Sequence, residues 1–218
     1  MAVFVVDIGN TRAHVGLYEG GRLHAVRHVP HARLGDARWR GEVAYASVNP
    51  AAERRFLKAA PHAARLGRDF PPAITVRCRG SGLDRQANAA AAWARCRRAC
   101  AVIDLGTAIT VDVVNSRGEF VGGMIAPGLR LQARALHEHT AQLPRVEPRV
   151  RRTIGRGTRE AIEAGLSFGV EGLIREVRRA LRVRTIGTGG DARLFGGLLD
   201  EVVPGLTLEG IAISYARR

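Results

Sequence analysis

Lysine is almost absent from this sequence. Lys58 is the only lysine among 34 basic residues, so arginine carries nearly all of the positive charge behind a net charge of +14. The arginines are spread from Arg12 to Arg218, whereas a nucleic-acid surface favours a localised basic tail or stripe. We therefore interpret the charge as a compositional bias that also suits small anionic substrates, and we expect no nucleic-acid partner.

Long apolar runs and paired cysteines are also missing. No run approaches the ~18 residues that a membrane-spanning helix needs, and Asp7 and Asn10 interrupt the apolar stretch at the N-terminus. The three cysteines, Cys78, Cys96 and Cys100, are an odd number without partners at zinc-type spacing. These features predict a cytoplasmic protein without a membrane partner, whose thiols are reduced and packed as small hydrophobic groups.

Two similar stretches organise what the sequence does contain. The first covers residues 3–11 (VFVVDIGNT) and the second covers residues 101–112 (AVIDLGTAITVD). In each, a strand of the buried type ends in a carboxylate, Asp7 or Asp104, and a turn containing glycine leads to a second strand. Neither GxGxxG nor GxxxxGK[ST] follows the first strand, so a Rossmann or P-loop entry is excluded there.

The first of these turns has the composition of a phosphate-binding loop. Backbone amides of a glycine-containing hairpin, together with the side chains of Asn10 and Thr11, can converge on phosphate oxygens. Asp7 can hold hydrated Mg²⁺, which uses one or two carboxylates with waters and substrate phosphates. Taken alone, however, residues 7–11 favour an ordinary hairpin with a capping aspartate.

The two halves of the chain predict the same order of elements. Each begins with a strand that ends in an aspartate, followed by a glycine turn, two further strands, a helix and a strand. The expected strands are residues 3–7, 13–18, 22–28, 43–48, 73–76, 101–112 (with its turn) and 184–187; the expected helices are residues 51–60, 86–98, 129–139, 159–182 and 209–217. This order predicts a duplicated α/β domain with a cleft between the copies and a boundary near residues 97–101.

Asp84 stands at the N-terminal end of the alanine-rich helix expected over residues 86–98. As a helix cap it would contribute ~1 kcal/mol. Alternatively it is a carboxylate base beside Arg85, whose guanidinium can clamp a substrate carboxylate with two hydrogen bonds. The local sequence favours neither interpretation. Further on, Thr158 is expected to cap the helix of residues 159–182, and the basic residues 141–156 to form a surface loop.

Seven motifs, in this order, resemble those of type III pantothenate kinases, within the superfamily of actin-like ATPases and sugar and acetate kinases. They are Asp7-Ile8-Gly9-Asn10-Thr11, Gly82-Leu83-Asp84-Arg85, Asp104-Leu105-Gly106-Thr107-Ala108 with Asp112, Gly122-Gly123-x-Ile125-x-Pro127-Gly128, Thr140-Ala141-x-Leu143-Pro144, Gly157-Thr158 and Thr188-Gly189-Gly190. The resemblance implies an α/β fold of two duplicated actin-like (ribonuclease H-like) domains, each a mixed sheet flanked by helices, with a cleft between them. Residues 1–98 would form the domain with the ATP phosphate loop and the catalytic aspartate. Residues 99–218 would form the domain with the cation site, the adenosine side and the dimerisation surface.

The resemblance also implies an activity, namely ATP-dependent phosphorylation of pantothenate to 4'-phosphopantothenate, the first step of coenzyme A biosynthesis, by a homodimer. Asp84 would be the catalytic base. Asp104 would coordinate a monovalent cation, K⁺ or NH₄⁺, and Asp7 would bind Mg²⁺ through water. ATP would be bound by Asp7, Ile8, Gly9, Asn10, Thr11, Arg12, Ala13, His14 and Thr107. Pantothenate would be bound by Gly82, Leu83, Asp84, Arg85 and Thr158, with Arg85 pairing with its carboxylate.

One departure from the family pattern leaves two alternatives open. The family usually has a tyrosine about nine residues before the catalytic aspartate and a proline between them. Here that position is Thr75, and residues 76–81 contain neither residue type. The chain could therefore be an actin-like-fold kinase for another small hydroxyl substrate, or a non-catalytic regulator that binds ATP. The presence of Asp7, Asp84 and Asp104 together favours a kinase.

Overall fold

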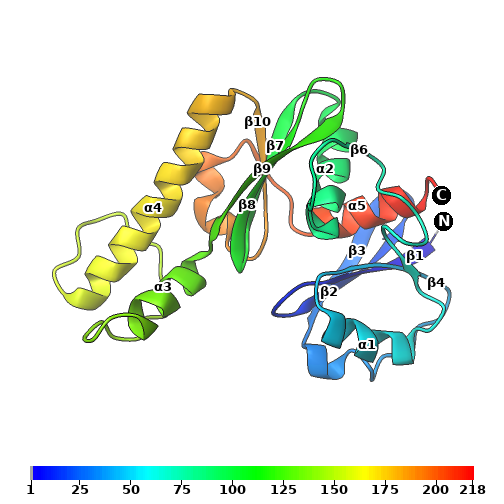
Figure 1. The fold of residues 1–218 in the computed structure, drawn as a ribbon, viewed down its shortest axis with the longest axis horizontal. Coiled ribbons are helices and arrows are strands. Elements are labelled where there is room, and N and C mark those ends of the chain that lie inside the picture. The colour runs from blue at the N-terminus through cyan, green and yellow to red at the C-terminus, as the bar shows by residue number, and fades with distance from the viewer. Residues whose placement is uncertain (1) are drawn as a thin grey trace. The chain divides into compact units, whose positions relative to one another are not determined.

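The computed structural model describes residues 2–218, and its first sheet is mixed (Figure 1). The five strands of this sheet lie in the order β3-β2-β1-β4-β5. They are β1 (Ala2–Ile8), β2 (Ala13–Glu19), β3 (Arg22–Val29), β4 (Glu42–Ser47) and β5 (Ala64–Arg65). β1 pairs antiparallel with β2 and parallel with β4, so its C-terminal end, with Asp7, lies between two neighbours.

The second sheet repeats the succession of the first. Its order is β11-β10-β7-β8-β9-β6. Its strands are β6 (Thr75–Val76), β7 (Cys100–Leu105), β8 (Ala108–Val114), β9 (Glu119–Pro127), β10 (Arg184–Thr188) and β11 (Glu201–Val202). Read as β9-β8-β7-β10-β11, it matches β3-β2-β1-β4-β5 strand for strand, and β6 is added beside β9. The α/β fold class with two mixed, helix-flanked sheets is confirmed.

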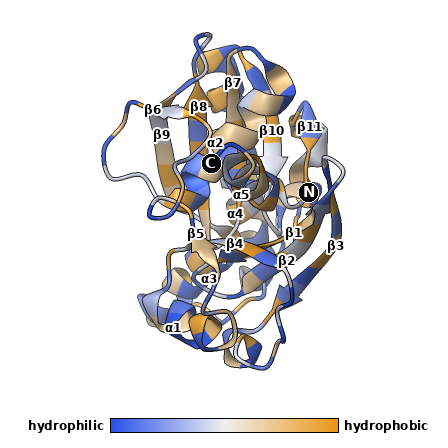
Figure 2. Ribbon diagram, turned by 90° about the vertical axis from the view of Figure 1, so that its right-hand side faces the viewer, coloured by the Kyte–Doolittle hydropathy of each residue, from blue (hydrophilic) through white to orange (hydrophobic). Residues whose placement is uncertain are grey.

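The helices begin close to where the sequence predicts them. The α-helices are α1 (Pro50–Ala59), α2 (Leu83–Cys96), α3 (Leu129–Glu138), α4 (Thr158–Leu181) and α5 (Leu206–Tyr215), and the 3-10 helices are η1 (His31–Arg33) and η2 (Ala192–Leu198). α1 starts with Pro50 and is capped by Asn49, whose Oδ1 accepts a hydrogen bond of 3.0 Å from Ala52 N–H. Hydrophilic and hydrophobic residues alternate in bands along α1 (Figure 2). Within residues 2–218, no helix combines the length and the apolar character that crossing a bilayer requires.

The cap predicted at Thr158 is wrong by one residue, and the interpretation of Asp84 as a helix cap, one of two left open, is wrong by two. Gly82 is the N-cap of α2, which begins three residues earlier than expected, so Asp84 lies inside the first turn. Gly157 is the N-cap of α4, and Thr158 is its first helical residue. Both caps are glycines in extended conformation without a side-chain hydrogen bond.

The chain forms two compact units that interleave along the sequence. One contains the residues up to Val102 together with Asp112–Gly123 and Gly205–Arg218, and the other contains Ile103–Val111 and Met124–Pro204. The predicted division into two domains, residues 1–98 and residues 99–218, stays a prediction, as does the cleft between the domains.

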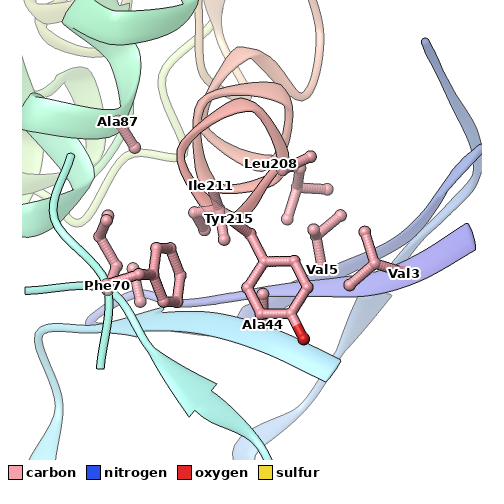
Figure 3. Close-up of a cluster of buried hydrophobic side chains, with 11 residues drawn as sticks. Val3, Val5, Ala44, Phe70, Ala87, Leu208, Ile211 and Tyr215 are labelled. Atoms are coloured by element: carbon pink, nitrogen blue, oxygen red, sulfur yellow. The ribbon is translucent and has the colours of Figure 1, made fainter. Parts of the chain in front are cut away.

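One buried cluster of the first unit is built around the C-terminal helix, and another includes Tyr45 and Phe56. Leu208 and Ile211 of α5 lie against Val3 and Val5 of β1, as Figure 3 shows. On another side, α5 approaches α2 so closely that a β-carbon at Gly210 would overlap the backbone of Ala87. The ten residues of α5, the last helix of the chain, thus pack against the first sheet. They also contact α2, the helix that carries Asp84, and hold it in place.

Candidate functional site

The first part of the site is the hairpin between β1 and β2. Asp7 lies opposite His14 in the antiparallel register, and the turn between them is closed by a hydrogen bond of 3.2 Å from Gly9 N–H to the Arg12 carbonyl. Asn10 and Thr11 are exposed at the tip, while Asp7 is buried with 8% of its surface exposed. The hairpin therefore presents exposed polar groups beside a largely buried carboxylate, as a phosphate and Mg²⁺ site requires.

Histidines line the outer side of this carboxylate. His14 Nδ1 lies 3.5 Å from Asp7 Oδ2. The His28 ring meets the His14 ring edge to face, with centroids 4.8 Å apart. Burial, with the neighbouring His14 and Arg12, lowers the pKa of His28, so that ring favours its neutral form.

The second part of the site is the start of α2. Asp84 Oδ1 accepts a hydrogen bond of 2.8 Å from the backbone N–H of Arg85. Burial raises the pKa of the Asp84 carboxyl group, the Arg85 N–H bond opposes this rise, and the negative charge of Asp7 adds to it. The structure thus brings Asp7 and Asp84 within electrostatic reach of each other. A raised pKa on a half-buried carboxylate is typical of a general base.

Gly82 leaves room for this carboxylate. A β-carbon at residue 82 would overlap Asp84 Oδ1. Leu83, the next residue, packs against Gly67 and against the core of the first unit. The GLDR motif therefore combines a glycine that tolerates the carboxylate, an apolar anchor and the acid itself.

Arg85 has a partner that the sequence analysis missed. Its Nε donates a hydrogen bond of 2.6 Å to Oδ1 of Asp112, a side chain of β8 with no exposed surface. The guanidinium carbon also lies 5.8 Å from the centre of the Phe120 ring. A carboxylate in the middle of a buried strand needs a cationic or hydrogen-bonding partner, and this requirement was the signal available in the sequence.

The third part of the site, in the second unit, is the turn between β7 and β8. Gly106 N–H donates to the Ala108 carbonyl at 3.1 Å, and Thr107 is exposed on the turn. The Thr107 carbonyl accepts a hydrogen bond of 3.0 Å from Gly128 N–H, where a β-carbon would overlap the Gly106 and Thr107 backbone. Gly128 in the Pro-Gly motif is thereby explained by the close approach of two backbones.

Asp104 lies next to a second glycine turn. Gly189, in the left-handed region with φ +88, stands where a β-carbon would overlap Asp104 Oδ1 and the Leu105 backbone. The Leu105 carbonyl accepts a hydrogen bond of 2.9 Å from Asp191 N–H. Backbone from the turn after β10 thus encloses this carboxylate.

Thr158 lies elsewhere in the second unit. It is exposed at the start of α4, where it lines an open pocket together with Gln142, Pro144, Arg156 and Arg159. The neighbouring basic stretch is partly neutralised, because Arg151 pairs with Glu160 at 3.1 Å. The Arg152 guanidinium likewise pairs with Glu171 at 2.7 Å.

Over residues 2–218, no three His, Cys, Asp or Glu side chains gather into a group that could enclose a metal ion. This fits Mg²⁺ bound with a nucleotide, because that ion keeps several waters and takes only one or two protein carboxylates beside substrate phosphates. Asp7, largely buried at the end of β1, supplies one such carboxylate. For a monovalent cation, the Asp104 carboxylate beside the Leu105 and Gly189 backbone offers oxygen donors of the right kind.

Comparison with known proteins identifies the lineage. The family model described as type III pantothenate kinase matches residues 37–180. A type III pantothenate kinase of Dehalococcoides mccartyi is 34% identical, covering 96% of this chain and 95% of its own. The type III pantothenate kinase of Syntrophotalea carbinolica is 35% identical, and the match covers 99% of this chain and 98% of the relative. The type III pantothenate kinase of Frankia alni is 34% identical, and the match covers 99% of each chain.

Solved structures share the fold at lower identity. A Campylobacter jejuni protein, described as a Baf family transcriptional activator, has a TM-score of 0.73 and 20% identity, with 98% of each chain covered. Ta0583, an archaeal actin homologue, has a TM-score of 0.51 and 14% identity, with each chain fully covered. These structures support the actin-like architecture that the strand order of the two sheets indicates.

Proposed function

Because this chain belongs to the type III pantothenate kinase family, we propose that it transfers the γ-phosphoryl group of ATP to the hydroxyl group of pantothenate. The product is 4'-phosphopantothenate, and the reaction opens coenzyme A biosynthesis. The observation that carries the proposal is the state of Asp84, a half-buried carboxylate at the start of α2 with a raised pKa.

Asp84 is the general base in this proposal. The pantothenate hydroxyl oxygen attacks the γ-phosphorus, the bond to the β–γ bridging oxygen breaks, and the hydroxyl proton passes to the Asp84 carboxylate. Phosphoryl transfer needs mainly positioning and charge neutralisation, so one well-placed base is sufficient on the acceptor side. The Arg85 N–H bond holds that carboxylate in one orientation.

The phosphates of ATP belong to the hairpin of residues 7–14, and Thr107 of the second unit contacts the nucleotide. Bound Mg²⁺ supplies positive charge against the phosphate oxygens, with Asp7 as its ligand through water. Asp104 holds K⁺ or NH₄⁺. Arg85 and Thr158 bind pantothenate, together with the backbone of Gly82 and Leu83.

The family also suggests the partners of this protein. We propose that it forms a homodimer, binds pantothenate and ATP, and does not bind nucleic acid. The ion pairs of Arg151 and Arg152 support the last point, because paired guanidinium groups contribute less to phosphate neutralisation.

The test is a coupled assay with the purified full chain, ATP, Mg²⁺ and K⁺, in which phosphopantothenate is identified by mass. We expect product only when pantothenate is present, and strong activation by the monovalent cation. ATP binding without turnover would instead support a regulator.

A second acceptor is favoured by one observation. Thr75, where the family usually has tyrosine, lies exposed on the two-residue strand β6. Threonine lacks the aromatic ring that the family usually has at this position, so a kinase with another small hydroxyl substrate is the alternative. A screen of small hydroxy acids with the same assay separates the two, and pantothenate should have the highest kcat/KM.

A further inference from the structure

The turn between β7 and β8 receives backbone hydrogen bonds from two other segments of the second unit. On one side Gly128 N–H, directly before α3, donates to the Thr107 carbonyl at 3.0 Å. On the other side Asp191 N–H, in the turn after β10, donates to the Leu105 carbonyl at 2.9 Å. The turn that follows Asp104 is therefore held by two segments that are far apart in sequence.

An ion pair joins these two segments to each other. Arg130, the second residue of α3, donates from Nη1 to both carboxylate oxygens of Asp191, at 3.0 and 3.1 Å, and from Nε to Glu147 Oε1 at 2.8 Å. The Asp191 side chain is 10% exposed, whereas the Glu147 side chain is 77% exposed. An exposed ion pair contributes little, but a buried carboxylate needs its cation, so the bond to Asp191 is the one that matters.

We infer that Arg130 and Asp191 are positioning residues for the β7–β8 turn, which hold the Asp104 carboxylate in place for its cation. The contacts form a closed ring that runs from the turn through α3 and the ion pair back to the turn. Gly189, two residues before Asp191, also lies against Asp104 Oδ1, so a shift of this segment would move a wall of the same site. The inference rests on the proposed function, because it takes Asp104 as the ligand of K⁺ or NH₄⁺.

The test is the K⁺ dependence of the melting temperature of the full chain, with Mg²⁺ and a non-hydrolysable ATP analogue present and ionic strength kept constant with tetramethylammonium chloride. Asp191→Asn keeps the backbone N–H and the shape of the side chain, but it loses the charge that holds Arg130. We expect the midpoint K⁺ concentration of the thermal shift to rise ~10-fold, the lower range for a residue behind a metal ligand. The K⁺ midpoint of activity should rise equally, while kcat at saturating K⁺ and the KM for pantothenate stay within about threefold.

Two further variants keep the result interpretable. Glu147→Gln is the matched control, because it breaks the exposed bond of the same arginine, and its K⁺ midpoint should equal that of the unmodified protein. Arg130→Gln should raise the midpoint as Asp191→Asn does, and the double variant should add little to either single change. The Arg130 side chain is 62% exposed, so Arg130→Gln carries the test if Asp191→Asn fails to fold by circular dichroism.

The outcomes separate the two proposals, because the melting temperature responds to K⁺ without turnover. A merely structural pair would lower the melting temperature equally with and without K⁺ and leave the midpoint unchanged. That result, or an equal midpoint shift in Glu147→Gln, would overturn the positioning role while leaving the kinase assignment intact. So would the absence of any K⁺ response in an unmodified protein that forms phosphopantothenate. Failure of the unmodified protein to phosphorylate pantothenate would overturn the proposed function itself.

Discussion

Gly189 stands directly beside Asp104, so that a β-carbon at residue 189 would overlap Oδ1 of the carboxylate. Two strands that are far apart in sequence, β7 and β10, both end at this point. The backbone of Gly189, after β10, lies directly against the backbone of Leu105, at the end of β7. Residue 189 also has φ +88, which side-chain-bearing residues rarely adopt. Both facts make glycine necessary here, and they connect the TGG motif to the proposed cation ligand.

Gly189→Ala should therefore impair the cation response before it impairs ATP binding. The added methyl group displaces the Asp104 carboxylate, so the K⁺ concentration for half-maximal activity should rise several-fold. The left-handed backbone and the overlap should together cost ~1–3 kcal/mol of stability. The measurements are a K⁺ titration of activity and urea unfolding. Gly197→Ala in η2, where a β-carbon meets nothing within 4 Å, is the control; an equal K⁺ shift in that variant would contradict the explanation.

Gly82→Ala should reduce the rate of the chemical step. The new β-carbon would overlap Asp84 Oδ1, so the base must leave its position next to Arg85 N–H. We expect kcat to fall by ~10²-fold, the lower range for loss of a positioned base, with the KM for ATP unchanged. Steady-state kinetics with both substrates measure this.

The control for that change is Gly172→Ala on α4, which meets nothing within 4 Å and has an ordinary helical backbone. This variant should keep its kcat and gain ~0.5–1 kcal/mol of stability from helix propensity. If Gly82→Ala retained full kcat, the assignment of Asp84 as the base would lose its geometric support.

Asp84→Asn should almost abolish turnover, lowering kcat by ~10²–10⁴-fold, because asparagine cannot accept the hydroxyl proton. In the unmodified protein the base must be ionised, so kcat/KM should fall as the pH drops through the raised pKa of Asp84. The midpoint of that fall should lie above the pKa of an exposed aspartate. A pH profile of kcat/KM measures it, and a profile that stays flat down to pH 4 would argue against Asp84.

The same substitution should stabilise the protein at neutral pH. The folded state holds Asp84 with a raised pKa, caused first by burial, so it favours the protonated form. Its contribution to stability is complete below the unfolded pKa and is lost as the pH rises through the folded pKa. Asp84→Asn should therefore have a higher melting temperature than the unmodified protein at pH 7, and the difference should vanish in acid. A lower melting temperature at pH 7 would contradict the cause assigned to the shift.

The strands and the motif turns could be predicted from the sequence because their signals are local. The apolar run before Asp7, and Gly20 and Gly21 with φ of 58 and 80 at the next hairpin, each specify a conformation on their own. The two-residue strands β5 and β11 could not be predicted, since two residues carry no period. The start of α2 was placed late because a glycine N-cap gives a weaker signal than serine or aspartate.

The pairings within the site were beyond local reasoning. Asp112 and Arg85 are separated by 27 positions, and nothing in either motif says which cation compensates the buried carboxylate. Likewise, α5 reads as an apolar helix, but its packing on β1 in the N-terminal sheet depends on long-range contacts. The site residues and their roles stay predictions until they are tested.

The contact between α5 and α2 gives a test of the framework that holds Asp84. Gly210 lets α5 approach the Ala87 backbone, and the two helices are also joined by a hydrogen bond of 2.8 Å from Thr207 to Asn88. In Gly210→Ala a methyl group would overlap the Ala87 carbonyl, so the helices must separate, at a cost of ~1–3 kcal/mol in the free energy of unfolding. Urea denaturation should show a lower midpoint with an unchanged slope, and kcat should fall because α2 carries the base. Gly165→Ala on α4, which meets nothing within 4 Å, should instead be neutral or slightly stabilised; equal losses in both variants would mean that the close approach of α5 and α2 is not what the glycine provides.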